Sequence, residues 1–161
     1  MDYREPLGAG QFPANAAQSA NGTVCAICGA GPCAVWKNGT LLPPLPAERR
    51  TETLALSTDG TRLATVSVTG QVYSAVVWSI TNAGTAPALL HEFPFPARKM
   101  AFNPDARWLA LGSNAENAVV DLTSSGIAAR WSAVRGGVTF SARSFVRTQL
   151  GSYFIRVLRV F

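Results

Sequence analysis

The sequence has few charged residues and a single histidine. Charged residues make up 14% of the 161 residues, and hydrophobic residues make up 48%; soluble domains typically have roughly 25% charged residues. No apolar run approaches the roughly 18–20 residues that a membrane-spanning helix needs. The opening residues, MDYREPLGAGQFP, mix charges and lack the apolar core of a secretory signal. We therefore expect a domain with a large buried core and a cytoplasmic location.

Acidic residues are absent after Asp121. Residues 1–126 hold nine acidic and eight basic residues, whereas residues 127–161 hold six arginines and no acid. The net charge of +5 therefore combines a near-neutral body with a basic end. We expect residues 142–161 to form an irregular basic and apolar tail.

The tail could bind an anionic membrane surface or a nucleic acid if it formed an amphipathic helix. Its helical face would comprise Leu150, Phe154, Val157, Leu158 and Phe161. Candidate contacts beside that face are Arg147, Arg156 and Arg159. Tyr153, Ile155 and Val160 interrupt the polar face, so we favour a strand or a disordered end.

The sequence contains one short pattern twice. LALSTDGTRLATVS, residues 54–67, returns as MAFNPDARWLALGS, residues 100–113, after 46 residues. Each copy predicts a strand, a tight turn and a second strand, because Asp59-Gly60 and Asn103-Pro104-Asp105-Ala106 are turn sequences.

Two more strands are expected after each copy. Residues 71–80 and 86–93 follow the first copy, and residues 117–123 and 127–131 follow the second. Four short strands in each period of roughly 40–50 residues are typical of a propeller blade. A small β-sandwich with strands that repeat by chance is the alternative, and no segment before the tail has convincing helical periodicity.

The two copies resemble a WD-repeat blade, whose pattern runs aFSPDGxxLASGSxDGxVxlWDl. Trp78 takes the family's Trp position, and in the second copy Val120 and Asp121 take the Trp-Asp positions. His91 lies near the place of the family's Gly-His. The resemblance implies a β-propeller with His91 in a structural role. Because Ser79 follows Trp78, the family's buried His–Ser–Trp–Asp network is incomplete, and packing must stabilise these blades.

A partial copy precedes the two full copies. TVCAICGAGPCAVWKNGTLLPPLP is similar to the last three strands of a blade, with Trp36 in the Trp place, and GGVTFSA is similar to the first strand of a further blade. We therefore predict an all-β, incomplete β-propeller of about three four-stranded antiparallel blades with an irregular basic C-terminal tail. The expected blades are residues 20–50, 51–96 and 97–134, with the start of another up to 141, after an N-terminal extension of residues 1–19.

The predicted number of blades is too small for a closed ring, because propellers usually have four to eight. The chain could be a fragment of a larger propeller, could complete its ring with a second copy or another protein, or could remain an open stack. We favour the fragment, because the copies look cut off and not capped.

The three cysteines, Cys25, Cys28 and Cys33, form a C-x2-C-x4-C pattern. The pattern begins like a zinc knuckle, but a tetrahedral site needs a fourth ligand, and Asn38 occupies the next expected place. Cys25 and Cys28 would also point to opposite faces of a strand. We favour packing of the thiols in the core over a metal site or a redox site.

Other short motifs predict turns. Gly29-Ala30-Gly31-Pro32 is too short and too far from a helix to cradle a phosphate. Asn21-Gly22-Thr23 and Asn38-Gly39-Thr40 are formal glycosylation sites, but Asn-Gly is also a preferred hairpin turn. We expect no catalytic residue, metal ligand or cofactor.

The resemblance implies a non-enzymatic scaffold that binds other proteins, with self-association as a further possibility. Rim loops are where a rigid framework presents contact residues. Arg49, Arg50, Arg98 and Lys99 lie where strands enter blades, and they are our candidate contacts.

A narrower alternative concerns the endoplasmic-reticulum WD-repeat exchange factors that activate the Sar GTPase. The first blade resembles theirs in the order of Phe12-Pro13, residues 24–31 and Asn38-Gly39. This resemblance implies nucleotide exchange on a small GTPase, although the family's glycine run and loop lysine are not kept.

Overall fold

The computed structural model describes residues 13–29, 33–45, 50–82, 84–124 and 126–132. Within these ranges the protein is all-β, with twelve strands and no helix. Among the same residues, no helix long and apolar enough to cross a membrane occurs.

The twelve strands form three four-stranded sheets, and in each sheet neighbouring strands pair antiparallel in sequence order. The first sheet contains β1 (Pro13–Gln18), β2 (Val24–Gly29), β3 (Ala34–Lys37) and β4 (Thr40–Leu41). The second contains β5 (Arg50–Leu56), β6 (Arg62–Thr69), β7 (Val72–Ser79) and β8 (Ala88–Phe93). The third contains β9 (Lys99–Phe102), β10 (Trp108–Gly112), β11 (Glu116–Asp121) and β12 (Gly126–Ser132).

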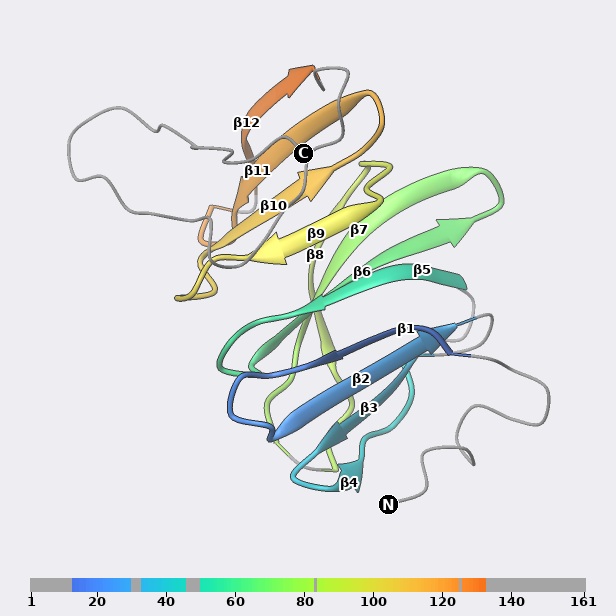
Figure 1. Ribbon diagram of the computed structural model, residues 1–161, viewed down its shortest axis with the longest axis vertical. Helices are drawn as coiled ribbons and strands as arrows, with labels where there is room; N and C mark the ends of the chain where they lie inside the picture. Colours follow the sequence, from blue (N-terminus) through green and yellow to red (C-terminus); the bar gives the residue numbers. More distant parts are fainter. Residues whose placement is uncertain (1–12, 30–32, 46–49, 83, 125, 133–161) are drawn as a thin grey trace, which may run out of the picture.

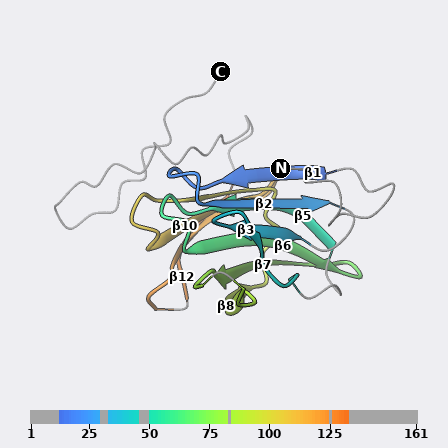
Figure 2. The same ribbon diagram turned by 90° about the horizontal axis from the view of Figure 1, so that it is seen from below.

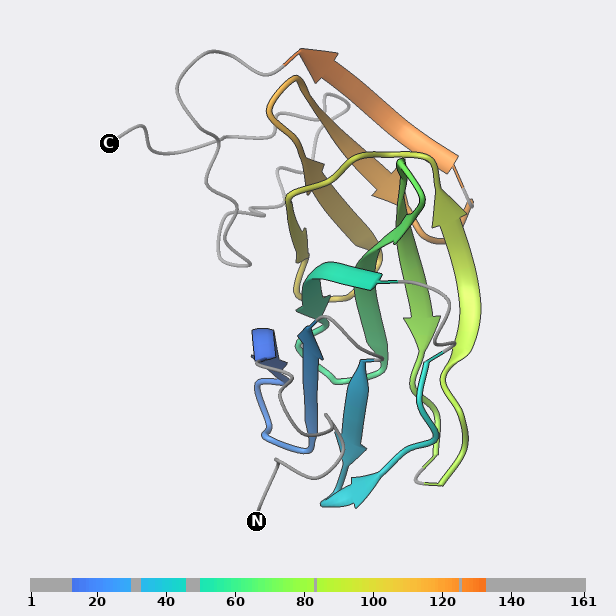
Figure 3. The ribbon, with the colours of Figure 1, turned by 90° about the vertical axis from the view of Figure 1, so that its right-hand side faces the viewer.

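The sheets follow one another in space in the order of the sequence, from the blue first sheet to the orange third sheet (Figure 1). The first strands lie together, since β1 contacts β5 and β5 contacts β9. Figure 2 shows the second sheet in the order β5, β6, β7 and β8, and in Figure 3 the outer strands β8 and β12 lie on the side opposite β1 and β9. This arrangement is that of an incomplete β-propeller with three blades.

The middle strands of the second sheet are buried on both faces, because this sheet packs on the first sheet and on the third. In β7, Ala75 and Val77 pack in the core shared with the third sheet, whereas Val76 and Trp78 pack in the core shared with the first. Four consecutive buried residues are therefore required here. Several other strands also have runs of consecutive buried residues. These runs explain why the sequence is rich in apolar residues and poor in charged ones.

One turn is built three times, between the first two strands of each sheet. In each copy the side chain that begins the turn donates a hydrogen bond to the Asn or Asp two residues later. The bonds are Ser19 Oγ to Asn21 Oδ1 (2.8 Å), Ser57 Oγ to Asp59 Oδ1 (2.7 Å) and Asn103 Nδ2 to Asp105 Oδ1 (2.6 Å). The next residue has a positive φ: Gly22 (70°), Gly60 (70°) and Ala106 (57°). The expected turns at Asp59-Gly60, at Asn103-Pro104-Asp105-Ala106 and at Asn21-Gly22 are thus confirmed.

The first blade differs from the sequence-based expectation. Residues 1–19 were assigned to an extension and the first sheet to three strands, but β1 occupies Pro13–Gln18 and pairs with β2. The strand was not expected because β1, PANAAQ, has no large apolar residue to mark it. The second Asn-Gly turn was predicted well: Asn38 and Gly39 both have positive φ, at 51° and 78°, and join β3 to β4.

Candidate functional site: the two rims of the blade array

The sheets present two rims. The turn rim comprises the repeated turns, residues 19–23, 57–61 and 103–107, with the connections that follow β3, β7 and β11. The hairpin rim comprises the starts of β1, β5 and β9 and the connections β2–β3, β6–β7 and β10–β11. Two hydrogen bonds between blades show that like ends are neighbours: Asn15 Nδ2 donates to the Glu52 carbonyl on the hairpin rim (2.6 Å), and the Ala20 amide donates to the Thr58 carbonyl on the turn rim (3.1 Å).

The carboxylates of the turn rim are held by their own turns. Asp59 accepts hydrogen bonds from the Ser57 hydroxyl (2.7 Å) and from the Thr61 amide (3.0 Å) and hydroxyl. Burial of Asp59 favours its neutral form, but the hydrogen bonds from Ser57 and Thr61 outweigh burial and hold its pKa below its ordinary value. This carboxylate is part of the turn.

Asp121, at the end of β11, has similar partners. Its carboxylate binds the Arg107 guanidinium (Nη2 to Oδ2, 2.9 Å) and accepts the Thr123 amide (2.9 Å) and hydroxyl (2.7 Å). The bond from Arg107 and those from Thr123 hold its pKa well below the usual range. Arg107 also lies over the Trp108 ring, 5.0 Å from its centroid.

Three polar side chains, Lys37, Arg62 and His91, join one blade to the next near the turn rim. Lys37 Nζ donates to the carbonyls of Ile80 (3.3 Å) and Thr81, and Arg62 Nη1 donates to the Ala106 carbonyl (2.6 Å). The His91 Nε2 atom lies 3.1 Å from the Leu122 carbonyl oxygen. Ile80 and Leu122 each follow the third strand of their blade. Lys37 and His91 therefore each bind the same part of the next blade, at two successive interfaces.

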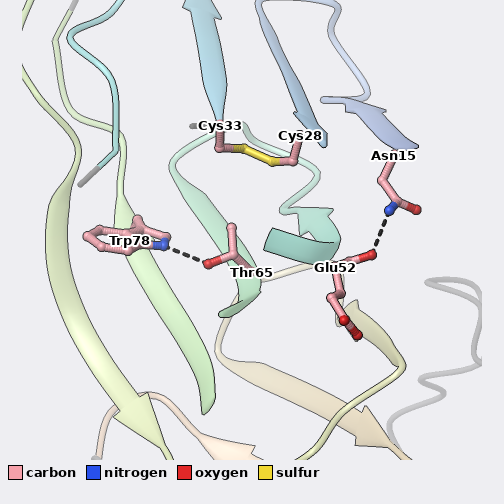
Figure 4. Close-up of a disulfide and its surroundings, with 6 residues drawn as sticks. All are labelled: Asn15, Cys28, Cys33, Glu52, Thr65 and Trp78. Atoms are coloured by element: carbon pink, nitrogen blue, oxygen red, sulfur yellow. Dashed lines mark hydrogen bonds between the residues drawn. A yellow bond between two sulfur atoms is a disulfide. The ribbon is translucent and has the colours of Figure 1, made fainter. Parts of the chain in front are cut away.

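The residues that carried the WD resemblance lie mostly in the cores. Trp78 is buried and its Nε1 donates to Thr65 Oγ1 over 2.9 Å (Figure 4). Trp36 packs against Ala34 and Ile27 at the first sheet. His91 contacts the next blade and stacks on Phe93 at 5.9 Å between ring centroids. The Trp78–Thr65 bond is a buried polar contact between neighbouring strands of the second sheet.

The hairpin rim carries the predicted contact residues that the structure describes. Arg98 precedes β9 and Lys99 begins it, and both side chains are exposed. Within the described ranges, neither side chain has a hydrogen bond or an ion pair. The same rim contains the β6–β7 turn, where Val72 is 63% exposed.

The remaining candidate contacts are Arg50 and four arginines outside the described residues. Arg50 is the first residue of β5 and pairs with Val68, which places its backbone on the hairpin rim. Arg49 lies outside the described residues, as do the tail candidates Arg147, Arg156 and Arg159. No group of three or more metal-ligating side chains occurs among the residues that the structure describes.

Cys28 and Cys33 are buried as expected, but they are not free thiols. Cys28 and Cys33 form a disulfide, with 0% and 1% of their surfaces exposed. The expectation of free thiols packed in the core is therefore wrong for this pair. The pairing of Ile27 with Ala34 places residues 28 and 33 opposite each other at the next step, which a hairpin register would have indicated. Cys25 is free and half-buried, on the opposite face of β2.

Comparisons with known proteins show the fold. No family model matches the chain, and no curated protein is similar to it in sequence. It is similar to the Cps50 (Swd1) β-propeller domain of Myceliophteria thermophila, with 14% identity, a TM-score of 0.60, and coverage of 75% of this chain and 41% of that chain. It is also similar to a putative 6-phosphogluconolactonase of Bacteroides uniformis, with 15% identity, a TM-score of 0.57, and coverage of 75% and 40%.

These similarities define the class of fold. The three sheets are blades of a β-propeller type, and the chain spans about 40% of the length of each solved structure. At 14–15% identity, activity does not transfer with the fold.

Proposed function

We propose that the chain is a sector of a non-enzymatic β-propeller scaffold that binds a partner protein at the hairpin rim. The contrast between the rims carries this proposal. On the turn rim, the charged side chains Lys37, Asp59 and Asp121 are occupied by intramolecular contacts. On the hairpin rim, Arg98 and Lys99 are exposed and unpaired within the described ranges.

Unpaired cations on a rigid rim favour an acidic partner surface. Opposite charges guide encounter and orient the partner, although each exposed ion pair adds only about 0.2–1 kcal/mol. Val72, 63% exposed on the same rim, supplies an apolar contact. The expected partner surface therefore combines acidic side chains with an apolar group.

The three blades would act as one sector of a larger ring. Closed propellers have about four to eight blades, and the chain covers about 40% of its solved neighbours. The described hairpin rim would then form part of a longer binding surface to which further blades contribute.

A short polyglutamate peptide with one terminal tryptophan tests the proposal. With a fluorescent dye attached to the peptide, because the chain has four tryptophans of its own, we expect binding in fluorescence anisotropy and a loss of affinity as salt is added. The double variant Arg98→Gln/Lys99→Gln should bind roughly 2–10-fold more weakly, as the loss of two exposed ion pairs implies.

The matched control places the same change in net charge on the other rim. Thr81 and Asn82 are exposed, and Thr81→Glu/Asn82→Glu lowers the net charge by as much as the hairpin-rim variant does. This control should bind within about twofold of the unaltered chain. Equal loss in the two variants would mean that only net charge matters, and the hairpin rim would not be the binding site.

A further inference from the structure

The Cys28–Cys33 disulfide lies at the interface between the first two blades. Cys28 is in β2, Cys33 precedes β3, and their Cα atoms are 4.3 Å apart. Both residues belong to the core in which the first sheet packs on Leu63, Val76 and Trp78 of the second. Figure 4 shows the bond between the two strands on the side of the second blade.

The same end of the interface contains a polar link. Asn15 pairs with Cys28 in the β1–β2 register, and its side-chain amide donates to the Glu52 carbonyl of β5 over 2.6 Å. The disulfide fixes β3 to β2, β2 holds β1, and Asn15 of β1 reaches the second blade. A covalent bond at Cys28 therefore constrains the residues that dock the first blade.

We propose that this disulfide is a redox-dependent clasp that holds the first blade in the conformation that packs on the second. It closes a short loop, and closure of a loop restricts the unfolded chain. The proposal does not depend on partner binding at the hairpin rim.

The pairing is selective because Cys25 cannot compete. Cys25 is three residues before Cys28 in the same strand, so its side chain lies on the opposite face of β2. It is half-buried, and burial raises the pKa of its thiol, which lowers the thiolate fraction available for exchange. Cys25 therefore remains a free thiol when the clasp forms.

Formation of the clasp requires a disulfide oxidant such as oxidised glutathione. The thiolate of one of the two cysteines attacks a sulfur of the oxidant, forms a mixed disulfide and releases one glutathione thiolate. The other protein thiolate attacks the protein sulfur of that mixed disulfide and releases the second glutathione. Two protein thiols are oxidised, one glutathione disulfide is reduced to two thiols, and the two protons pass to the glutathione released.

The clasp affects which cellular compartment would favour the stability of the chain. Disulfides persist in oxidising compartments and are rare in the cytosol, so the clasp favours an oxidising compartment over the cytoplasmic location expected from composition. Because Cys28 and Cys33 are buried, exchange requires an opening of the structure that exposes their sulfur atoms.

Thiol counting with thermal unfolding tests the clasp in the full chain. After equilibration with oxidised glutathione and denaturation in an alkylating reagent, we expect one alkylated cysteine, Cys25, and three after dithiothreitol. Reduction should lower the Tm by roughly 4–8 °C.

Two variants separate the clasp from a general effect of reductant. Cys25→Ala should respond to dithiothreitol like the unaltered chain, whereas the Tm of Cys28→Ala/Cys33→Ala should not respond. Three alkylated cysteines in oxidising buffer, a disulfide that includes Cys25, or an unchanged Tm after verified reduction would each overturn the proposal. Thiol counting on the unaltered chain decides the pairing even where the double variant does not fold.

Discussion

At the scale of single residues, Asp121 links the end of β11 to the turn that precedes β10. Its carboxylate binds the Arg107 guanidinium and the amide and hydroxyl of Thr123. Val120, the residue before it, is buried in the core, so the bonds of Asp121 hold the strand end where that side chain packs. A carboxylate with these partners is stabilised in its charged form.

The lowered pKa of Asp121 predicts how its contribution depends on pH. A carboxylate whose pKa is lower in the folded state stabilises the fold above its unfolded pKa of 3.8, and that stabilisation is lost as the pH falls toward the folded pKa. We expect Asp121→Asn to lower the free energy of unfolding at pH 6, with a smaller difference from the unaltered chain at pH 2.5. Urea unfolding at both pH values measures this, and an equal difference at both would refute the assignment.

At the scale of elements, the first two repeated turns have the same backbone conformation but different neighbours. Gly22 and Gly60 both have φ of 70°. A Cβ at Gly60 would lie 2.8 Å from Val24 Cγ2 and 3.2 Å from Ser19 Cβ, whereas one at Gly22 would have only Gln18 Nε2, at 3.5 Å, as a near neighbour. The turn at Gly60 therefore packs on the first blade.

This pair of glycines separates backbone strain from packing between blades. Gly22→Ala should cost about 1 kcal/mol, because an L-residue is disfavoured at positive φ. Gly60→Ala should cost that amount and roughly 1–3 kcal/mol more for the clash with Val24. Equilibrium urea denaturation of the two variants measures the difference. Equal losses would show that the first blade moves aside at this contact without cost.

Much of the element structure could be predicted, and the failures have physical causes. The second and third blades were predictable because Asp59-Gly60 and Asn103-Pro104 mark turns between apolar strands. The turn at Ser19 follows the same chemistry, with Ser19 and Asn21 in the places of Ser57 and Asp59. A turn was expected there from Asn21-Gly22, but the strand before it was not, because β1, PANAAQ, has no large apolar residue to mark a strand.

The site was less predictable than the strands. The positions of Arg98 and Lys99 at the start of a strand followed from the repeat. Whether their side chains form ion pairs or hydrogen bonds depends on neighbours in space, and within the described ranges they form none. The same holds for Lys37 and His91, which bind carbonyl groups of the next blade. Contacts between blades join residues 31–44 positions apart, and local patterns do not contain that information.

At the scale of the whole molecule, the second blade contributes to both large cores of the described residues. One core contains residues of the first and second sheets, and the other contains residues of the second and third. In an array of this kind, stability is approximately the sum of terms for each repeat and each interface between neighbours. Damage at one interface should therefore leave the far blade folded.

Leu63 and Leu109 allow a matched test of this arrangement. Both are fully buried at equivalent places in β6 and β10, opposite Trp78 and Val120, but Leu63 lies in the first core and Leu109 in the second. Replacement of either by Ala should cost about 2–5 kcal/mol. In hydrogen exchange, Leu63→Ala should speed exchange in the first and second sheets and spare the third, and Leu109→Ala should spare the first. Faster exchange in all three sheets of both variants would instead mean that the blades unfold as one cooperative unit, with the second blade transmitting the loss from one interface to the other.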